Sequence, residues 1–314
     1  METTPTLCIG FHGIPGALTE GALHSLVQLQ RTGTLFNNHH VKSVPFETLD
    51  TLFAALHDHE VDYIMLPVEN TRSGTIHSTM DRLIGSTPSM YVVGEYVYNE
   101  PYCLLAPEGT QLEQITEVHS HPHVLAQCRE FITERLPHGQ HMVLVQGEST
   151  ASSAKRVADL TQRDRLSILH HMRRVDCPRL PTTSSVQHGV RPFTLDEPHR
   201  AAIAGESAAK LYKLDVLERD IARDKNPLTR YFLMGLQPVE PERHQSPKTS
   251  LVITVANRSG ALFKVLGCFA LRDINVCKLE SRPSRRTTQR SRLSAPWEYT
   301  IYLDLDGSAT VDEA

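Results

Sequence analysis

Residues 63–74 read YIMLPVENTRSG, and this stretch decides the fold class. Its first five residues predict a buried strand, because a short apolar run that ends at turn signals is typical of one. Its second half is polar and begins where that strand ends. Outward from this stretch, similar strands alternate with segments whose apolar residues recur at helical spacing, as at Leu18, Ala22 and Leu26. This alternation predicts an α/β fold.

The alternation continues to about residue 236, with one interruption. Residues 161–200 contain seven Arg and four His and show little apolar periodicity, so we expect a partly disordered surface insertion there. A polar, Pro-rich linker follows at 237–247. Residues 248–314 then read as strand, helix, strand, strand, in which Gly260 opens the helix. This βαββ order predicts a ferredoxin-like unit that lacks its last helix and strand.

Composition excludes several classes of protein. The chain has 314 residues, enough for about two domains, and a net charge of −4, which gives no general footprint for nucleic acid. No apolar run is long enough to span a membrane and the first residues carry no secretory signal, so we expect a cytoplasmic protein. Six scattered Cys form no CxxC pair, and the 17 His fit no metal-ligand spacing, so neither disulfides nor a metal is predicted.

Hydroxyl residues recur where predicted strands end and helices begin. They are Thr71, Ser73, Ser120 and Thr150. In open α/β sheets the crevice at the carboxyl ends of the strands is the usual ligand site, and helix N-termini attract anions. For each residue alone, a role as a helix cap is the favoured explanation. Together they favour a small ligand that carries carboxylates.

The tract NPLTRY (226–231) places an amide, a hydroxyl and a fixed cation where a strand begins. Arg230 suits a carboxylate, and Thr229 suits a hydrogen bond to a departing group. The alternative is a turn followed by an ordinary strand, and spacing alone favours that alternative.

Read together, the tracts resemble the prephenate dehydratase family, including its arogenate dehydratase branch in plants. The matching pieces of the main part are GIPGALTE (13–20), LPVENTRSGTIHSTMD (66–81), VGEY (93–96), YCLLA (102–106), SHPHVLAQC (120–128), STASSA (149–154), AAIAGESAAKLY (201–212) and TRYFLM (229–234). The last unit resembles the family's regulatory ACT domain through KTSLVITVANRSGALFKVL (248–266), LRDINVCKLESRP (271–283) and WEYTIYLD (297–304).

The resemblance implies a catalytic domain over 1–236, with two lobes like those of periplasmic binding proteins, and a truncated ACT domain over 248–314. It implies conversion of prephenate to phenylpyruvate, with loss of water and carbon dioxide and without a cofactor. Thr229 would hydrogen-bond the leaving hydroxyl, and Arg230 would anchor a carboxylate or organise the turn. The cleft residues that it implies for substrate are Glu69, Asn70, Thr71, Gly74, Ser120, His121, Gln127, Thr150 and Asn226.

For the ACT domain the resemblance implies a homo-oligomer, a dimer or tetramer, with feedback by phenylalanine at a subunit interface. The residues that would bind phenylalanine are Asn257, Gly260, Ala261, Leu262, Glu280, Ser281 and Arg282. The chain departs from the family pattern at Pro227, which stands where the family's amide usually does, and at Thr71, Gly205 and Tyr231. Two alternatives therefore stay open: an arogenate dehydratase, and a binding protein that senses an aromatic acid without turnover.

Overall fold

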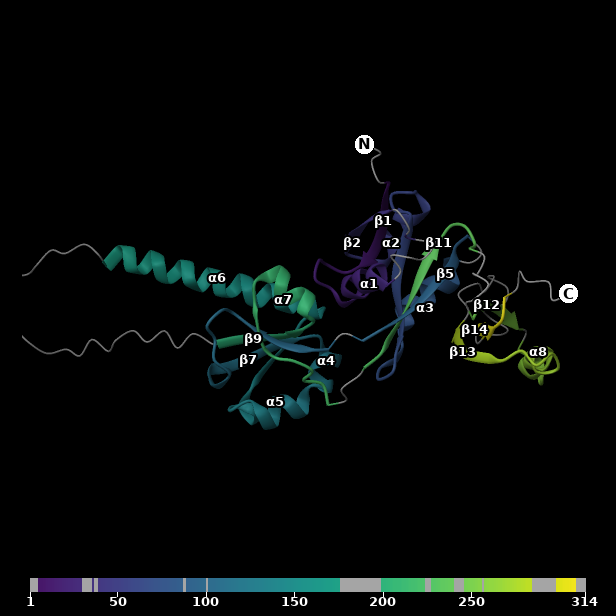
Figure 1. Ribbon diagram of the computed structural model, residues 1–314. Helices are drawn as coiled ribbons and strands as arrows, with labels where there is room; N and C mark the ends of the chain where they lie inside the picture. The colour runs from purple at the N-terminus through teal and green to yellow at the C-terminus, as the bar shows by residue number, and fades with distance from the viewer. Residues whose placement is uncertain are drawn as a thin grey trace, which may run out of the picture.

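Three units lie in a row in the computed structural model of the chain (Figure 1). The structure describes residues 5–29, 36, 39–86, 89–99, 101–175, 199–223, 227–239, 246–255, 257–283 and 298–308. Each unit is built on one sheet. The first two are the lobes of an α/β body, and the third is the C-terminal unit, residues 248–308, which lies against the first lobe.

The first lobe contains a mixed sheet with strand order β2-β1-β3-β11-β5. Its elements are β1 (Thr6–His12), α1 (Leu18–Leu29), β2 (His40–Phe46), α2 (Leu49–His57), β3 (Tyr63–Asn70), β4 (Gly74–Thr75), α3 (His77–Ser86), β5 (Tyr91–Tyr98) and β11 (Thr229–Gly235). Strands β1, β2 and β3 are parallel, whereas β11 is antiparallel to both β3 and β5. β3 is the strand that YIMLP predicts.

Packing on both faces explains why β3 is an unbroken apolar run. Met65 packs with α1 on one face of the sheet, and Ile64 and Leu66 pack with α2 and α3 on the other. Strands covered on both faces read as continuous hydrophobic runs rather than as an alternating pattern. Tyr302 and Val252 of the C-terminal unit complete the second of these clusters.

The second lobe has a five-stranded sheet of order β10-β6-β9-β7-β8. Its elements are β6 (Cys103–Ala106), η1 (Leu112–Gln114), β7 (Ile115–Ser120), α4 (Pro122–Gln127), α5 (Arg129–Arg135), η2 (Gly139–His141), β8 (Val143–Gln146), α6 (Thr150–Val175), β9 (His199–Ala204), α7 (Glu206–Tyr212) and β10 (Asp215–Glu218). The chain crosses between the lobes twice, from β5 to β6 and from β10 to β11. The predicted two-lobed α/β body is confirmed.

The expected insertion over 161–200 is corrected at both of its ends. Residues 161–175 continue α6, and His199 already begins β9. α6 runs outward beyond the sheet that it covers (Figure 1). Leu166 in this part is 58% exposed, and the low apolar periodicity of the sequence hid the continuation of the helix. Residues 176–198 lie outside the described part of the chain.

The C-terminal unit has the predicted βαββ order. It consists of β12 (Lys248–Val255), α8 (Ala261–Ala270), β13 (Val276–Pro283) and β14 (Tyr299–Asp306), with strand order β12-β14-β13. Ile301, Leu303 and Leu305 pack toward α8 with Phe269. The other face, with Thr300, Tyr302 and Asp304, is turned toward the first lobe. No helix in the described residues is long and apolar enough to cross a membrane.

Candidate active site

The end of β3 and the start of β11 bring two predicted site residues together. Asn70 lies opposite Thr229 in the antiparallel register, and Asn70 Nδ2 donates a 2.8 Å hydrogen bond to Thr229 Oγ1. Asn70 Oδ1 accepts from the backbone N–H groups of Arg72 and Ser73, at 2.9 and 3.3 Å. Because a backbone N–H can only donate, these two contacts fix which way the amide points. The Thr229 oxygen is therefore an acceptor here, and its own proton is directed away from Asn70.

The loop beyond β3 is held against the segment that leads into β11. Thr71 N–H donates to Leu228 O (3.0 Å), and Leu228 N–H donates to Thr71 Oγ1 (3.1 Å). Gly74 has a φ of +73°, in the left-handed region that favours glycine, where the chain turns into β4. In this structure, predicted residues Thr71 and Gly74 shape the loop that carries Asn70.

Glu69 and Arg230 point to the opposite face, because successive residues of a strand alternate. Arg230 Nη1 donates to Glu69 Oε1 at 2.9 Å, and Arg230 Nη2 donates to Asp304 Oδ2 of the C-terminal unit at 2.7 Å. Lys278 donates to the other Glu69 oxygen. The structure thus separates the predicted cleft residues into two pairs, Asn70 with Thr229 and Glu69 with Arg230. The position of Arg230 corresponds to the organising role that the resemblance implies, with its guanidinium already bound by carboxylates.

Burial and ion pairing act in opposite directions at this second pair. Burial by itself raises the pKa of Glu69, but the hydrogen bonds from Lys278 and Arg230 outweigh it, and the net pKa is lowered. Burial lowers the pKa of Arg230, but the hydrogen bonds that Arg230 donates to Glu95 and Glu69 outweigh it, so the net pKa is raised. Both groups are therefore charged at neutral pH.

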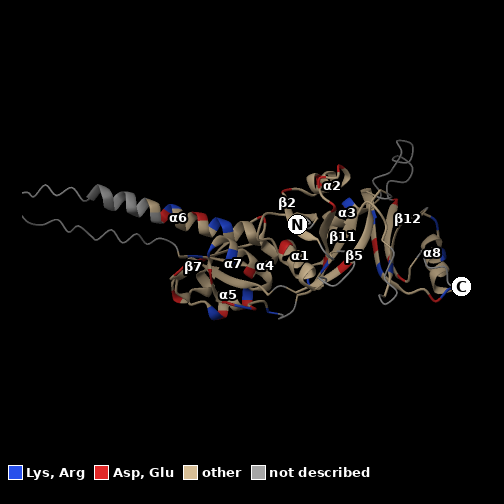
Figure 2. Cartoon of the chain, turned by 45° about the horizontal axis from the view of Figure 1, so that its top comes forward, with Lys and Arg blue, Asp and Glu red and all other residues tan. Residues whose placement is uncertain are grey.

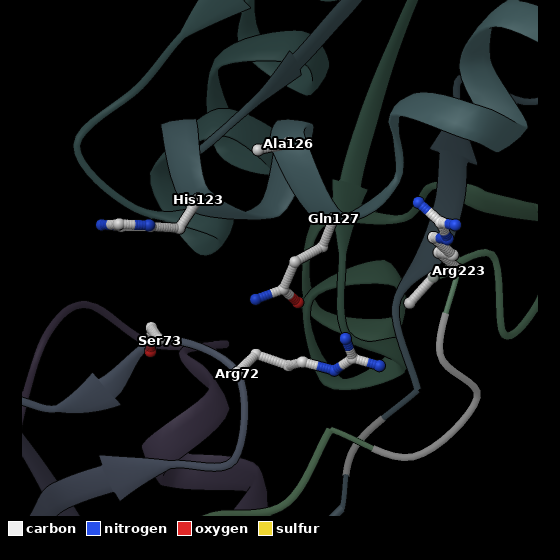
Figure 3. Close-up of a pocket in the computed structure, with 7 residues that line it drawn as sticks. Arg72, Ser73, His123, Ala126, Gln127 and Arg223 are labelled. Carbon is white, nitrogen blue, oxygen red and sulfur yellow. The ribbon is translucent and has the colours of Figure 1, made fainter.

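A pocket of about 310 Å³ lies between the two lobes (Figure 3). The first lobe supplies two residues and the second lobe five: Arg72, Ser73, His123, Ala126, Gln127, Ala222 and Arg223. Figure 3 shows the Gln127 amide pointing from α4 toward the Arg72 side chain across the gap. Gln127 Oε1 is buried and has no hydrogen-bond partner among the described residues. The pocket is therefore cationic and contains an amide that a ligand can bind.

The remaining predicted residues of the second lobe lie at strand and helix ends, but not all of them face the pocket. Ser120 is fully buried, and its hydroxyl donates to Ile203 O at 2.7 Å. His121, rather than Ser120, is the N-cap of α4. Thr150 is the buried first residue of α6, whose first turn is capped by the Ser149 hydroxyl accepting from Ser152 N–H. Ser120 and Thr150 thus stabilise the lobe in this structure.

The surroundings of His121 favour its neutral form, because its pKa is lowered. Burial lowers its pKa, and the neighbouring His123 lowers it further. Its Nδ1 accepts from His123 N–H at 3.4 Å, which requires that nitrogen to be unprotonated. Of the described residues, no three His, Cys, Asp or Glu are placed to hold a metal ion.

The residues predicted to bind phenylalanine fall into separate places. Asn257, Gly260, Ala261 and Leu262 lie at the start of α8, where Gly260 is the N-cap with a φ of +74°. Glu280 and Arg282 point to the first lobe: Glu280 accepts from Thr75 Oγ1 (3.0 Å), and Arg282 forms two hydrogen bonds with Asp81 (2.7 and 3.0 Å). Ser281 alternates with them and points to the other face of β13. The described contacts do not join the two groups.

Sequence reasoning missed most of the pocket. Gln127 was predicted, but Arg72 and Arg223 were not, although Arg72 stands inside the tract LPVENTRSGTIHSTMD (66–81). Arg223 lies 151 residues from Arg72 in sequence, and its backbone N–H donates to Gln127 O at 3.2 Å. A cation within the loop after a strand was the available signal for Arg72. No local signal marks Arg223, and Asn226 lies outside the described residues.

Comparison with known proteins identifies the family. A family model described as prephenate dehydratase matches residues 9–239. Arogenate dehydratase/prephenate dehydratase 2, a chloroplastic protein of Arabidopsis thaliana, is 30% identical over 96% of this chain and 65% of its own length. A bifunctional chorismate mutase/prephenate dehydratase of Enterobacter agglomerans is 30% identical over 79% of this chain and 51% of its own length. The chain thus spans about 65% of the length of the first plant relatives.

A solved structure extends the likeness to the whole architecture. The crystal structure of a prephenate dehydratase from Arthrobacter aurescens, in complex with L-Phe, is 26% identical to this chain. The two share a TM-score of 0.71 over 97% of this chain and 82% of that one. The coverage includes both lobes and most of the C-terminal unit.

Proposed function

The chain belongs to the prephenate dehydratase family, and on that premise we propose that it converts prephenate to phenylpyruvate, water and carbon dioxide. The observation that carries the proposal is the Thr229 hydroxyl, which accepts from Asn70 and keeps its own proton for a ligand. A hydroxyl in this state can donate a hydrogen bond to the oxygen that leaves the substrate ring.

The proposed reaction asks little of the protein, because forming the aromatic ring supplies the driving force. The bond from the ring to its carboxylate breaks, its electron pair enters the ring, and the ring C–O bond breaks at the opposite carbon. The departing oxygen takes up a proton and leaves as water. An alkyl hydroxyl such as Thr229 is a weak acid, so it acts by hydrogen bonding in the transition state rather than by full proton transfer.

The cationic pocket supports the substrate part of the proposal. Prephenate carries two carboxylates, and Arg72 and Arg223 line the pocket from opposite lobes without a carboxylate among the lining residues. Arg223 Nε lies 3.3 Å from Glu130 Oε2, a pair whose side chains are 76% and 51% exposed. Such an exposed pair is weak enough for a ligand carboxylate to replace it. The Asn70 side chain accepts from the backbone N–H groups of Arg72 and Ser73 and donates to the Thr229 hydroxyl. Asn70 thus joins the loop that lines the pocket to Thr229.

Arogenate is the second candidate substrate, because the plant relatives with 30% identity include arogenate dehydratases. Arogenate differs from prephenate by an ammonium group in place of the side-chain keto group. The two arginines favour the more anionic molecule, which is prephenate. Phenylalanine would be the product from arogenate, so the two reactions are told apart by their products.

We also propose that the C-terminal unit is a regulatory ACT domain that binds phenylalanine at the start of α8, around Asn257 and Gly260. The L-Phe in the related structure supports this role. The proposal includes a homo-oligomer of this chain, either a dimer or a tetramer. The cytoplasmic location stays a prediction that no finding tests.

The test is to incubate the purified protein with prephenate and, in parallel, with arogenate. Formation of phenylpyruvate and of phenylalanine is measured with no metal or nucleotide added. We expect turnover of prephenate with the higher kcat/KM. Arg223→Gln should raise KM by about 10-fold or more, the loss of one charge-assisted contact. Arg219→Gln is the matched control, since Arg219 is exposed and pairs with Glu206 outside the pocket. Binding of prephenate without any product would support the sensing protein instead.

A further inference from the structure

Six charged side chains meet where the first lobe contacts the C-terminal unit, and Arg230 lies at their centre. Its Nη2 donates to Glu95 at 2.5 Å, in addition to its bonds to Glu69 and Asp304. These three carboxylates come from β3, β5 and β14. We call the whole group the Arg230 cluster; it consists of Glu69, Glu95, Arg230, Lys248, Lys278 and Asp304. Figure 2 shows acidic and basic positions facing each other across this boundary.

The Arg230 cluster is balanced in charge, and its centre is removed from solvent. It contains three acids and three bases, and the Asp304 and Arg230 side chains are 0% and 12% exposed. The C-terminal unit fixes Asp304 further, because Asp304 Oδ1 accepts from Ser250 Oγ (2.7 Å) and Tyr302 OH (2.6 Å). Removing one partner from such a group leaves a buried charge without compensation, which is costly. The guanidinium is therefore held firmly in one place by a residue of the C-terminal unit.

The backbone of β3 is irregular opposite Arg230. Arg230 pairs with Glu69 and Tyr231 pairs with Pro67, so Val68 is an extra residue in β3, which is the signature of a bulge in that strand. A bulge bends its strand and changes where the neighbouring side chains point. Glu69 and Asn70 follow this bulge in β3 and pair with Arg230 and Thr229, and the Thr229 hydroxyl accepts from Asn70 on the face opposite to Arg230. Because Arg230 also binds the Glu69 side chain, whatever fixes Arg230 also fixes the paired backbone that carries Asn70 and Thr229.

We propose that Arg230 is a positioning residue, through which Asp304 of the C-terminal unit sets the orientation of the Thr229 hydroxyl. This inference rests on the proposed function of Thr229. The C-terminal unit then takes part in turnover without contacting substrate. Asp304 holds the Arg230 guanidinium, the guanidinium holds Glu69 beside the bulge in β3, and the paired residues Asn70 and Thr229 next to them keep the hydroxyl in its orientation. The loss of this control should appear in kcat and leave KM nearly unchanged, because the carboxylate-binding pocket lies on the other side of the strand.

The test is Asp304→Asn, which keeps the size of the side chain and removes its charge. We expect kcat for prephenate to fall by about 10-fold to 100-fold, the range for small misplacement of a reacting group, with KM within about 2-fold. Asp81→Asn is the matched control. It breaks another ion pair across the same boundary, that with Arg282, which involves α3 and not β11. An equal loss of kcat in Asp81→Asn would overturn the inference, because general loosening of the boundary would then be the cause.

A double-mutant cycle shows whether Asp304 acts through Thr229. In the Thr229→Ala background, Asp304→Asn should lower kcat by less than about 2-fold, because the group that it positions is already gone. Losses that multiply in the double variant would overturn the inference. This result is distinct from a failure of the proposed function, in which the wild-type protein turns over neither substrate or Thr229→Ala has wild-type kcat.

Lys278→Gln keeps the inference testable if Asp304→Asn does not fold. Lys278 reaches the Arg230 cluster from β13, where it binds Glu69 and is 10% exposed. Its removal should lower kcat in the same sense, by about 3-fold to 10-fold, since Arg230 keeps all three of its carboxylates. Thermal melts of each variant report its folded fraction. A folded Lys278→Gln variant with wild-type kcat would count against the inference.

Discussion

Replacing Asn70 with aspartate reverses a single hydrogen bond at the candidate active site. The carboxylate has the shape of the amide and still accepts from the N–H groups of Arg72 and Ser73, which bind Asn70 Oδ1 at 2.9 and 3.3 Å. Its second oxygen, however, can only accept, whereas Asn70 Nδ2 donates to Thr229 Oγ1 at 2.8 Å. The Thr229 hydroxyl must then donate to the new carboxylate, and its proton is no longer free for the leaving oxygen.

The expected magnitudes for activity and for stability differ sharply. Loss of one transition-state hydrogen-bond donor costs about 10²-fold to 10³-fold in kcat. The loop keeps both of its contacts, so the free energy of unfolding should change by less than about 1 kcal/mol. Asn70→Ala is the contrasting variant, since it removes all three hydrogen bonds of the side chain. Each hydrogen bond contributes about 0.5–1.5 kcal/mol, and water partly replaces the two with the Arg72 and Ser73 N–H groups. Asn70→Ala should therefore destabilise the chain by about 1–3 kcal/mol.

The assay is phenylpyruvate formation at saturating prephenate, with urea unfolding of the same samples. Asn70→Asp should behave in kcat like Thr229→Ala, for which we expect a loss of about 10²-fold to 10⁴-fold. A folded Asn70→Asp variant that keeps more than a tenth of wild-type kcat would refute the reasoning. In that case the direction of the Thr229 proton does not matter to turnover.

Two further predictions concern the C-terminal unit and its boundary. The pKa of Glu69 in the folded chain lies below its ordinary value of 4.5, so its contribution to stability is present above that pH and is lost as the pH falls through the folded value. The difference in Tm between wild type and Glu69→Gln should therefore be largest near pH 6 and shrink below pH 4.5; parallel curves would contradict this. Phenylalanine at 100 times its Kd should stabilise the chain by about 2.7 kcal/mol, and Asn257→Ala should blunt the rise in Tm. A melt that phenylalanine leaves unchanged would remove the effector role.

Much of the architecture follows from local patterns. The run YIMLP becomes β3 because its apolar residues are covered on both faces, and the βαββ order of the last unit follows from β-branched strands around an amphipathic helix. The pattern failed at the end of α6, where the helix extends beyond its sheet (Figure 1) and residues 161–175 show little apolar periodicity in sequence. Periodicity reports which face of a helix is buried, so a segment without it gives no helical signal even when it continues a helix.

The candidate site, like the fold, was predicted from the sequence only in part. The sequence by itself, through its resemblance to a family, placed Asn70 and Thr229 at one site for a small ligand with carboxylates, but it placed Glu69 and Arg230 at that site as well. Only the tertiary structure decided which face is the cleft and which is the boundary with the C-terminal unit. It also brought Arg223 across from the second lobe to the pocket that Arg72 lines. The reason is physical: alternation and capping act over a few residues, whereas the facing of a sheet and the meeting of two lobes depend on packing between segments far apart in the chain.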